Sequence, residues 1–324
     1  MTTREHINDY FNGRPFMVLC ALALVVTAAT ALSIGVSLAA DEFTGLFFSF
    51  KGSIIESGPL SAAINVLCIL LTGGILLAVN KLFTFARSMT HLFASAYFLL
   101  QLAYPQGLVS LHAGTLICLV TALTLPVLFA TYQDRHSQRR VFLISALLSA
   151  GCLFHYGFLF LIPAFVIGFL YMGVLNLKGM LATLFGLVTP MWIVLGLGIA
   201  SPSDAVAPLW MAQQWPTMSP TLVLAAVTAL MGIVLAAINL HTIMNYRMQT
   251  RVYNMFFIIV LMLALIALCL NPQAINVYLP LLSLMVAVQV ALVHSLRTSP
   301  YRYIFLLLLI AACAGCCIVN LMPS

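Results

Sequence analysis

The stretch "SLAADEFTGLFFSFKG", residues 37–52, places two adjacent acids, Asp41 and Glu42, directly after a long apolar run. Adjacent carboxylates can hold a divalent cation or act as a general base. Lys51, which follows in the same stretch, is a candidate for binding a phosphate. Acids at such a position are also typical of the solvated end of a membrane span. The catalytic and the topological interpretation of Asp41 and Glu42 therefore both stay open.

Histidines within apolar sequence form the second group of candidates. His155 and Tyr156 lie in "GCLFHYG", residues 151–157, and His112 lies near the start of another apolar run. A histidine at membrane depth can relay protons or bind a phosphate. The alternative for His155 is that its imidazole hydrogen-bonds nearby carbonyls and only stabilises the turn, and the alternative for His112 is a residue of the membrane interface. We treat all three residues as candidate lipid-phosphate ligands.

Two further motifs resemble known sites without matching them. "CAGCC", residues 313–317, has the spacing of a CxxC pair, but a zinc site needs about four ligands, so packing of apolar thiols is the better interpretation. The arginines of "YQDRHSQRR", residues 132–140, could bind a phosphate. Such loops more often anchor membrane topology. We predict no metal cluster made of these side chains.

The composition excludes a water-soluble protein. Of the 324 residues, 63% are hydrophobic and only 6% are charged, whereas soluble domains have about 25% charged residues. The net charge of +6 does not indicate nucleic-acid binding, because the basic residues are scattered between apolar runs. The lipid bilayer is thus the main partner of this surface.

The apolar runs predict an all-α, polytopic transmembrane bundle of about eleven spans. They cover residues 16–40, 59–79, 85–104, 107–130, 141–153, 157–176, 179–200, 220–240, 254–270, 273–294 and 303–321. With the N-terminus inside and the C-terminus outside, every lysine and arginine except Lys51 falls on the cytoplasmic side. Asp41, Glu42, Glu56 and Asp204 fall outside. This asymmetry is a strong positive-inside signal.

Residues 141–176 are predicted to form a helical hairpin. A single helix of this length would measure about 54 Å, against a hydrocarbon core of about 30 Å. It would also place Arg140 and Lys178 on opposite sides of the membrane. We therefore expect a tip near residues 151–157 and a first arm of only about 20 Å.

The chain is interpreted as one integral membrane domain, residues 1–324, without a soluble domain. Two longer outer segments interrupt the spans, residues 41–58 and 201–219. Both are rich in aromatic residues, which settle at membrane interfaces. We expect both segments to lie along the outer leaflet.

Several stretches resemble an uncharacterised family of inner-membrane proteins from Bacteroidota. They are "YFNGRPF", "SAGCLFHYGFLFLIPAFVIGFLY", "LKGMLATLFGLVTPMWI" and "INVYLPLLSLMVAVQVALVHSLR". The resemblance covers most of the chain and rests on apolar patterning. It implies a multi-pass protein of a bacterial inner membrane and no particular activity.

A weaker, architectural resemblance is to GT-C-like membrane glycosyltransferases that use polyprenyl-phosphate-linked sugars. Those enzymes have many spans, an acidic residue in the first outer loop and aromatic interfacial helices there, which Asp41, Glu42 and the phenylalanines around them match in position. The chain departs from them in its few outer cations and its lack of a soluble domain. Fold-level analogy does not establish function.

Three functions are compatible with these observations. The first is an enzyme handling a polyprenyl-phosphate-linked sugar at the outer leaflet, with Asp41 or Glu42 as base or as ligand of a divalent cation. The second is a non-catalytic subunit of a larger inner-membrane assembly for secretion or envelope biogenesis, which would bind other inner-membrane proteins. The third is a small transporter, which the scarcity of charge within the spans disfavours.

Overall fold

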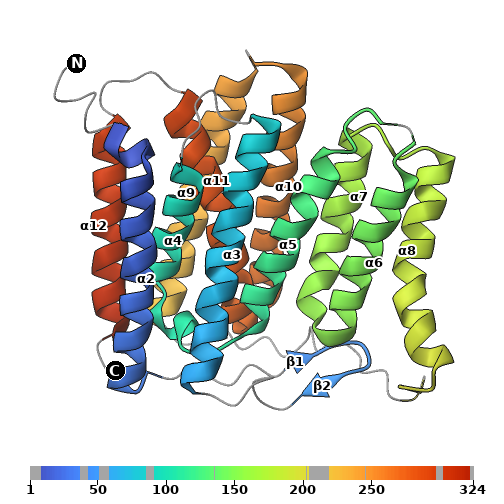
Figure 1. Cartoon of the computed structure of the whole chain (residues 1–324), viewed down its shortest axis with the longest axis horizontal. Helices are drawn as coiled ribbons and strands as arrows, with labels where there is room; N and C mark the ends of the chain where they lie inside the picture. Colours follow the sequence, from blue (N-terminus) through green and yellow to red (C-terminus); the bar gives the residue numbers. More distant parts are fainter. Residues whose placement is uncertain are drawn as a thin grey trace.

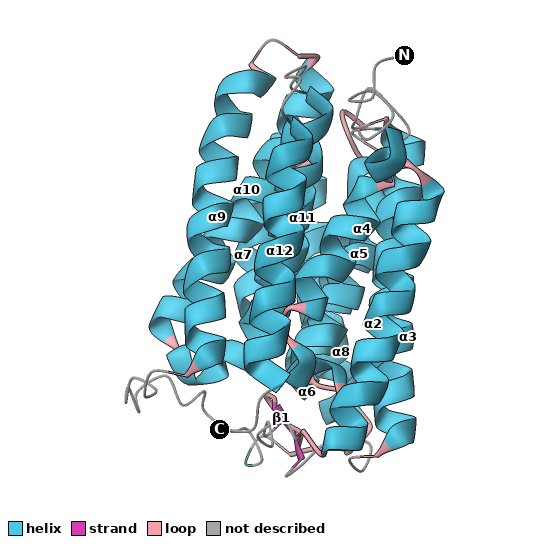
Figure 2. Cartoon of the chain, turned by 90° about the vertical axis from the view of Figure 1, so that its left-hand side faces the viewer, coloured by secondary structure: helices cyan, strands magenta, loops and turns pink. Residues whose placement is uncertain are grey.

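The computed structural model describes residues 9–36, 43–50, 58–84, 91–134, 136–201, 203, 219–244, 246–296 and 302–321. Asp41, Glu42 and Lys51, like Asp204 and most of the second outer segment, lie outside the described residues. The described chain forms a bundle of helices that run side by side between two ends (Figure 1). Figure 2 shows the same two ends from the side.

Each predicted apolar segment corresponds to one helix. The helices are α2 (Arg14–Ile34), α3 (Pro59–Phe83), α4 (Leu92–Leu102), α5 (Ala113–Phe129), α6 (Gln138–Phe154), α7 (Leu161–Tyr171), α8 (Leu177–Gly196), α9 (Pro220–Ile243), α10 (Met248–Leu270), α11 (Ile275–Leu296) and α12 (Arg302–Leu321). Short 3₁₀ turns precede α5, α7 and α11: η1 (Pro105–Leu108), η2 (Tyr156–Phe160) and η4 (Pro272–Ala274). The helical bundle agrees with the prediction. In lipid, the polar groups of the backbone can form all their hydrogen bonds only within helices or closed barrels.

A small two-stranded ribbon departs from a purely helical fold. Strands β1 (Phe43–Thr44) and β2 (Ser49–Phe50) pair antiparallel, with Phe43 opposite Phe50. The ribbon forms part of the first outer segment, residues 41–58, for which we expected an interfacial segment along the membrane. Its described part folds back on itself beside the helix ends (Figure 1).

Within the described parts of the chain, seven helices are long and apolar enough to cross a membrane. They are α2, α3, α8, α9, α10, α11 together with η4, and α12. Helix α4 is shorter, with 11 residues, and its residues from Leu92 to Gln101 are all buried. Helix α11 is also enclosed by its neighbours almost throughout. A helix that is apolar on every side is typical of the interior of a bundle, and the set of long apolar helices indicates a multi-pass membrane protein.

The described basic residues within the helices gather at one end of the bundle, which we call the basic end. Successive helices alternate in direction, so that the starts of α2, α6, α8 and α10 and the end of α3 meet there (Figure 1). These positions carry Arg14, Lys81, Arg139, Arg140, Lys178 and Arg251, with Arg247 just before α10. The charge asymmetry of the sequence is thus an asymmetry of the folded chain.

Cysteine labelling should show that the basic end faces the cytoplasm. In a cysteine-free background, His136→Cys and Gln249→Cys are exposed at the basic end, whereas Ser203→Cys is exposed at the opposite end. We expect an impermeant maleimide to label only Ser203→Cys in intact spheroplasts, and all three after permeabilisation, because positive loops remain inside. Labelling of position 136 or 249 from outside would contradict this orientation.

Candidate functional site

The chain reverses direction at His155, as the hairpin prediction requires. Helix α6 ends at Phe154, His155 is extended with φ −154° and ψ 130°, and η2 and α7 follow. The amide of Gln133, before α6, donates to the carbonyl of Met172, after α7, at 2.9 Å. Both arms therefore begin and end at the basic end, and the tip lies at the opposite end.

The relative length of the two arms was predicted wrongly. We expected a first arm of about thirteen residues, but α6 has 17 residues and measures about 25 Å. The second arm is no longer than the first, because it consists of η2 with 5 residues and α7 with 11. Helix α6 begins before the apolar run, because Arg139 and Arg140 in its first turn keep their side chains in the exposed surface of the basic end. The two arginines end the apolar run on its N-terminal side, but the helix continues through them.

The ribbon of the first outer segment docks onto the hairpin tip. The amide of Leu46 donates to the carbonyl of Cys152 at 3.1 Å, and the amide of Phe48 donates to the carbonyl of Leu153 at 3.4 Å. The rings of Phe48 and Phe154 stack with centroids 5.5 Å apart. Carbonyls in the last turn of a helix lack partners within that helix. The ribbon therefore supplies hydrogen-bond donors to the last carbonyl groups of α6, and it attaches the first outer segment to the tip.

His155 stabilises the turn that it begins. Its Nδ1 accepts a hydrogen bond from the amide of Gly157 at 2.8 Å, so the ring is neutral with its proton on Nε2. The side chain is 8% exposed, and this burial lowers the pKa of the imidazole well below its ordinary value. A Cβ at Gly157 would lie 2.6 Å from Ile117 of α5 and 2.9 Å from Val277 of α11. The tip is thus packed tightly against two other helices.

His112 lies directly before α5 and is 2% exposed. Its Nδ1 is 3.1 Å from the carbonyl of Ser110, and because a carbonyl can only accept, this nitrogen carries the proton. The hydroxyl of Thr115 lies 3.4 Å from each ring nitrogen. The two histidines therefore have different local partners.

Tyr156 differs from the histidines because its hydroxyl is unpaired. The residue is half-buried in η2, and its hydroxyl oxygen is buried without a hydrogen-bond partner among the described residues. A buried hydroxyl without a partner is costly, so each such group calls for an explanation. Of the predicted ligands that the structure describes, Tyr156 is the one with a free donor at the hairpin tip.

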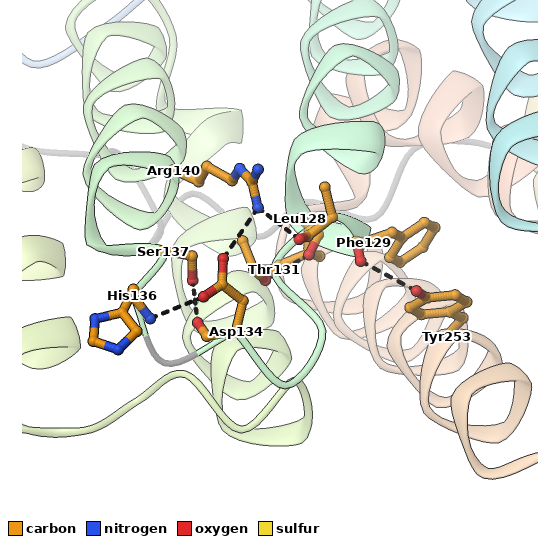
Figure 3. Close-up of polar contacts among 9 residues, drawn as sticks. Leu128, Phe129, Thr131, Asp134, His136, Ser137, Arg140 and Tyr253 are labelled. Atoms are coloured by element: carbon orange, nitrogen blue, oxygen red, sulfur yellow. Dashed lines mark hydrogen bonds and ion pairs between the residues drawn. The ribbon is translucent and has the colours of Figure 1, made fainter.

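The basic loop before α6 is held together by its own groups (Figure 3). Nη1 of Arg140 donates to the carbonyl of Ala130 at 2.7 Å and lies 3.4 Å from Oδ2 of Asp134. Oδ1 of Asp134 accepts from the amide of His136, and the hydroxyl of Ser137 donates to the carbonyl of Asp134. Exposed pairs of this kind contribute about 1 kcal/mol or less. Arg140 here shapes the loop and is not a free phosphate ligand.

A second polar cluster was missed by the sequence analysis. Asn239 of α9, Asn254 of α10 and Gln289 of α11 are fully buried and hydrogen-bonded to one another. The available signal was weak: single amides in three apolar runs far apart in the chain. Among the described residues, no three histidine, cysteine or acidic side chains are placed to hold a metal ion. Cys313 and Cys317 of the "CAGCC" motif are buried in α12 as free thiols.

Replacing Gly45 by alanine is expected to detach the ribbon from the tip. A Cβ at this position would lie 2.1 Å from the carbonyl oxygen of Leu153 and 2.5 Å from the backbone of Phe154. We expect hydrogen exchange at the amides of Leu46 and Phe48 to accelerate by roughly tenfold or more, because local opening removes protection. Mass spectrometry of the protein in nanodiscs would measure it. Leu46→Ala is the control, since it keeps the donating amide, and unchanged exchange in Gly45→Ala would contradict the docking.

Comparisons of the chain with protein-family models, with curated proteins and with solved structures found no match.

Proposed function

We propose that this multi-pass protein belongs to a bacterial inner membrane and handles a polyprenyl-phosphate-linked sugar at the end where the ribbon meets the hairpin tip. The observation that carries the proposal is the pair of hydrogen bonds from Leu46 and Phe48 to the end of α6. They join the segment that follows Asp41 and Glu42 to the tip that carries His155 and Tyr156. A transferase needs groups from separate segments held in one place.

The proposal assigns phosphate binding to the tip and to Lys51. The hydroxyl of Tyr156 is an unpaired donor, and Nε2 of His155 carries the proton that Nδ1 lacks. Neutral donors and one lysine can hold a lipid phosphate by hydrogen bonds and charge. His112, directly before α5, is the further candidate ligand of the phosphate in this proposal.

Asp41 or Glu42 would act as the base. Alternatively, the two carboxylates would bind a divalent cation. In the transfer, the acceptor oxygen forms a bond to the anomeric carbon of the sugar while the bond from that carbon to the phosphate oxygen breaks. The phosphate leaves with the electron pair, and the acceptor proton moves to the carboxylate.

The double variant Asp41→Asn, Glu42→Gln tests this function in the native host. We expect lipid-linked sugar to accumulate in membrane extracts while the abundance of the protein stays unchanged, because the substituted amides cannot accept the proton. Mass spectrometry of the extracted lipids measures the accumulation. Glu56→Gln, at another outer acid of the same segment, is the matched control. A silent double variant would refute the enzyme hypothesis.

A non-catalytic subunit is the second candidate, and the hydrogen bonds of the histidines favour it. Nδ1 of each imidazole is engaged within its own turn, as expected for residues that only shape the fold. This hypothesis predicts that a membrane partner co-purifies in fixed proportion with the tagged chain and falls in abundance when the chain is deleted. It also predicts that the double variant leaves assembly and growth unchanged.

A further inference from the structure

The three buried amides form a chain of hydrogen bonds across three helices. Nδ2 of Asn239 donates to the carbonyl of Gln289 at 3.0 Å and to its Oε1 at 2.7 Å. Nε2 of Gln289 in turn donates to Oδ1 of Asn254 at 3.2 Å. These bonds determine the orientation of each amide, since a flipped amide would place donor against donor or acceptor against acceptor.

This series of hydrogen bonds leaves one unsatisfied polar group at each of its two ends. Oδ1 of Asn239 is a buried acceptor without a donor, and Nδ2 of Asn254 is a buried donor without an acceptor. All three side chains have no exposed surface within the bundle. An unpaired amide group in a dry interior carries its full desolvation penalty. A donor is therefore needed at Oδ1 of Asn239 and an acceptor at Nδ2 of Asn254.

Water is the smallest molecule with that chemistry. Buried waters typically make about three hydrogen bonds to polar groups that would otherwise remain unsatisfied. Asn239 lies four residues before the end of α9, Asn254 six residues after the start of α10, and Gln289 seven before the end of α11. Along the helix axes, the network is therefore only about 6–10 Å from the basic end.

We propose that the α9–α10–α11 interior is a hydration site, in which bound water donates to Oδ1 of Asn239 and bound water accepts from Nδ2 of Asn254. The water completes a neutral polar network that links three helices. The site lies away from the hairpin tip and does not depend on the function proposed above.

Hydroxyl-radical footprinting with X-rays tests the proposal, because radicals generated from a bound water oxidise the side chains beside it even when they are buried. Phe257 lies one turn from Asn254, Met285 lies one turn from Gln289, and both are buried. In the full-length protein in nanodiscs, we expect these two to be oxidised severalfold faster than the equally buried Phe169 and Met172 of the α7 region.

Two variants separate hydration from general loosening of the bundle. Asn254→Leu removes the donor and should reduce oxidation of Phe257 to the rate of Phe169. Thr228→Val is the matched control, since the Thr228 hydroxyl is buried in α9 but donates only to the carbonyl of Leu224 in its own helix. Oxidation of wild-type Phe257 and Met285 no faster than that of Phe169 and Met172 would overturn the proposal, as would a rate that Asn254→Leu leaves unchanged. The wild-type comparison decides the matter even where the variant fails to fold.

Discussion

Leucine in place of Gly186 is expected to separate α8 from α6. A Cβ at Gly186 would lie 2.7 Å from the carbonyl oxygen of Phe142, 2.7 Å from Cβ of Ser145 and 3.2 Å from the amide nitrogen of Ala146. Two of these atoms belong to the backbone of α6, so they cannot move without moving the helix. Small residues at such crossings let membrane helices approach closely.

The effect should be large because α8 packs mainly on α6 and exposes much of its remaining surface. The hydroxyl of Ser149 donates to the carbonyl of Leu187 at 2.5 Å across the same contact, and separation would break this bond. Overpacking alone costs about 1–3 kcal/mol. We expect Gly186→Leu to lower the free energy of unfolding by about 3 kcal/mol, as measured by denaturant titration in mixed micelles.

Gly196→Leu, at the end of the same helix, is the control. The nearest atom to its added Cβ is Nε1 of Trp192 at 4.0 Å, so the change should stay within about 0.5 kcal/mol. A Gly186→Leu protein as stable as the wild type would show that α8 does not pack on α6 as described.

Two adjacent glycines of α3 should respond oppositely to alanine. At Gly73 the added Cβ would lie 2.4 and 2.5 Å from atoms of the Phe98 ring in α4, whereas at Gly74 nothing lies within 4 Å. Phe98 is buried, so its ring has little space to move. We expect Gly73→Ala to cost about 1–3 kcal/mol in the free energy of unfolding.

Gly74→Ala serves as the matched control at the neighbouring position. Alanine favours the helix by up to about 1 kcal/mol relative to glycine, so this variant should be neutral or slightly stabilising. The same titration of both variants compares one chemical change on two faces of one helix. Equal effects at the two positions would contradict the packing of α3 on α4.

The amino-acid sequence by itself determined the helices, the reversal at His155 and the gathering of basic residues at one end. Each of these follows from local properties: apolar length against membrane thickness, and the side on which charge remains. These features depend on the solvent around each segment and need no knowledge of its neighbours.

Only the tertiary structure decided which groups meet. It distinguishes Gly73, packed on Phe98, from Gly74, which faces open space, and it places the ribbon on the end of α6. It also joins Asn239, Asn254 and Gln289 from three separate apolar runs. The physical reason is that apolar runs of similar composition give no sign of which helix face meets which partner. That choice is made by close packing and by the pairing of buried polar groups across the bundle.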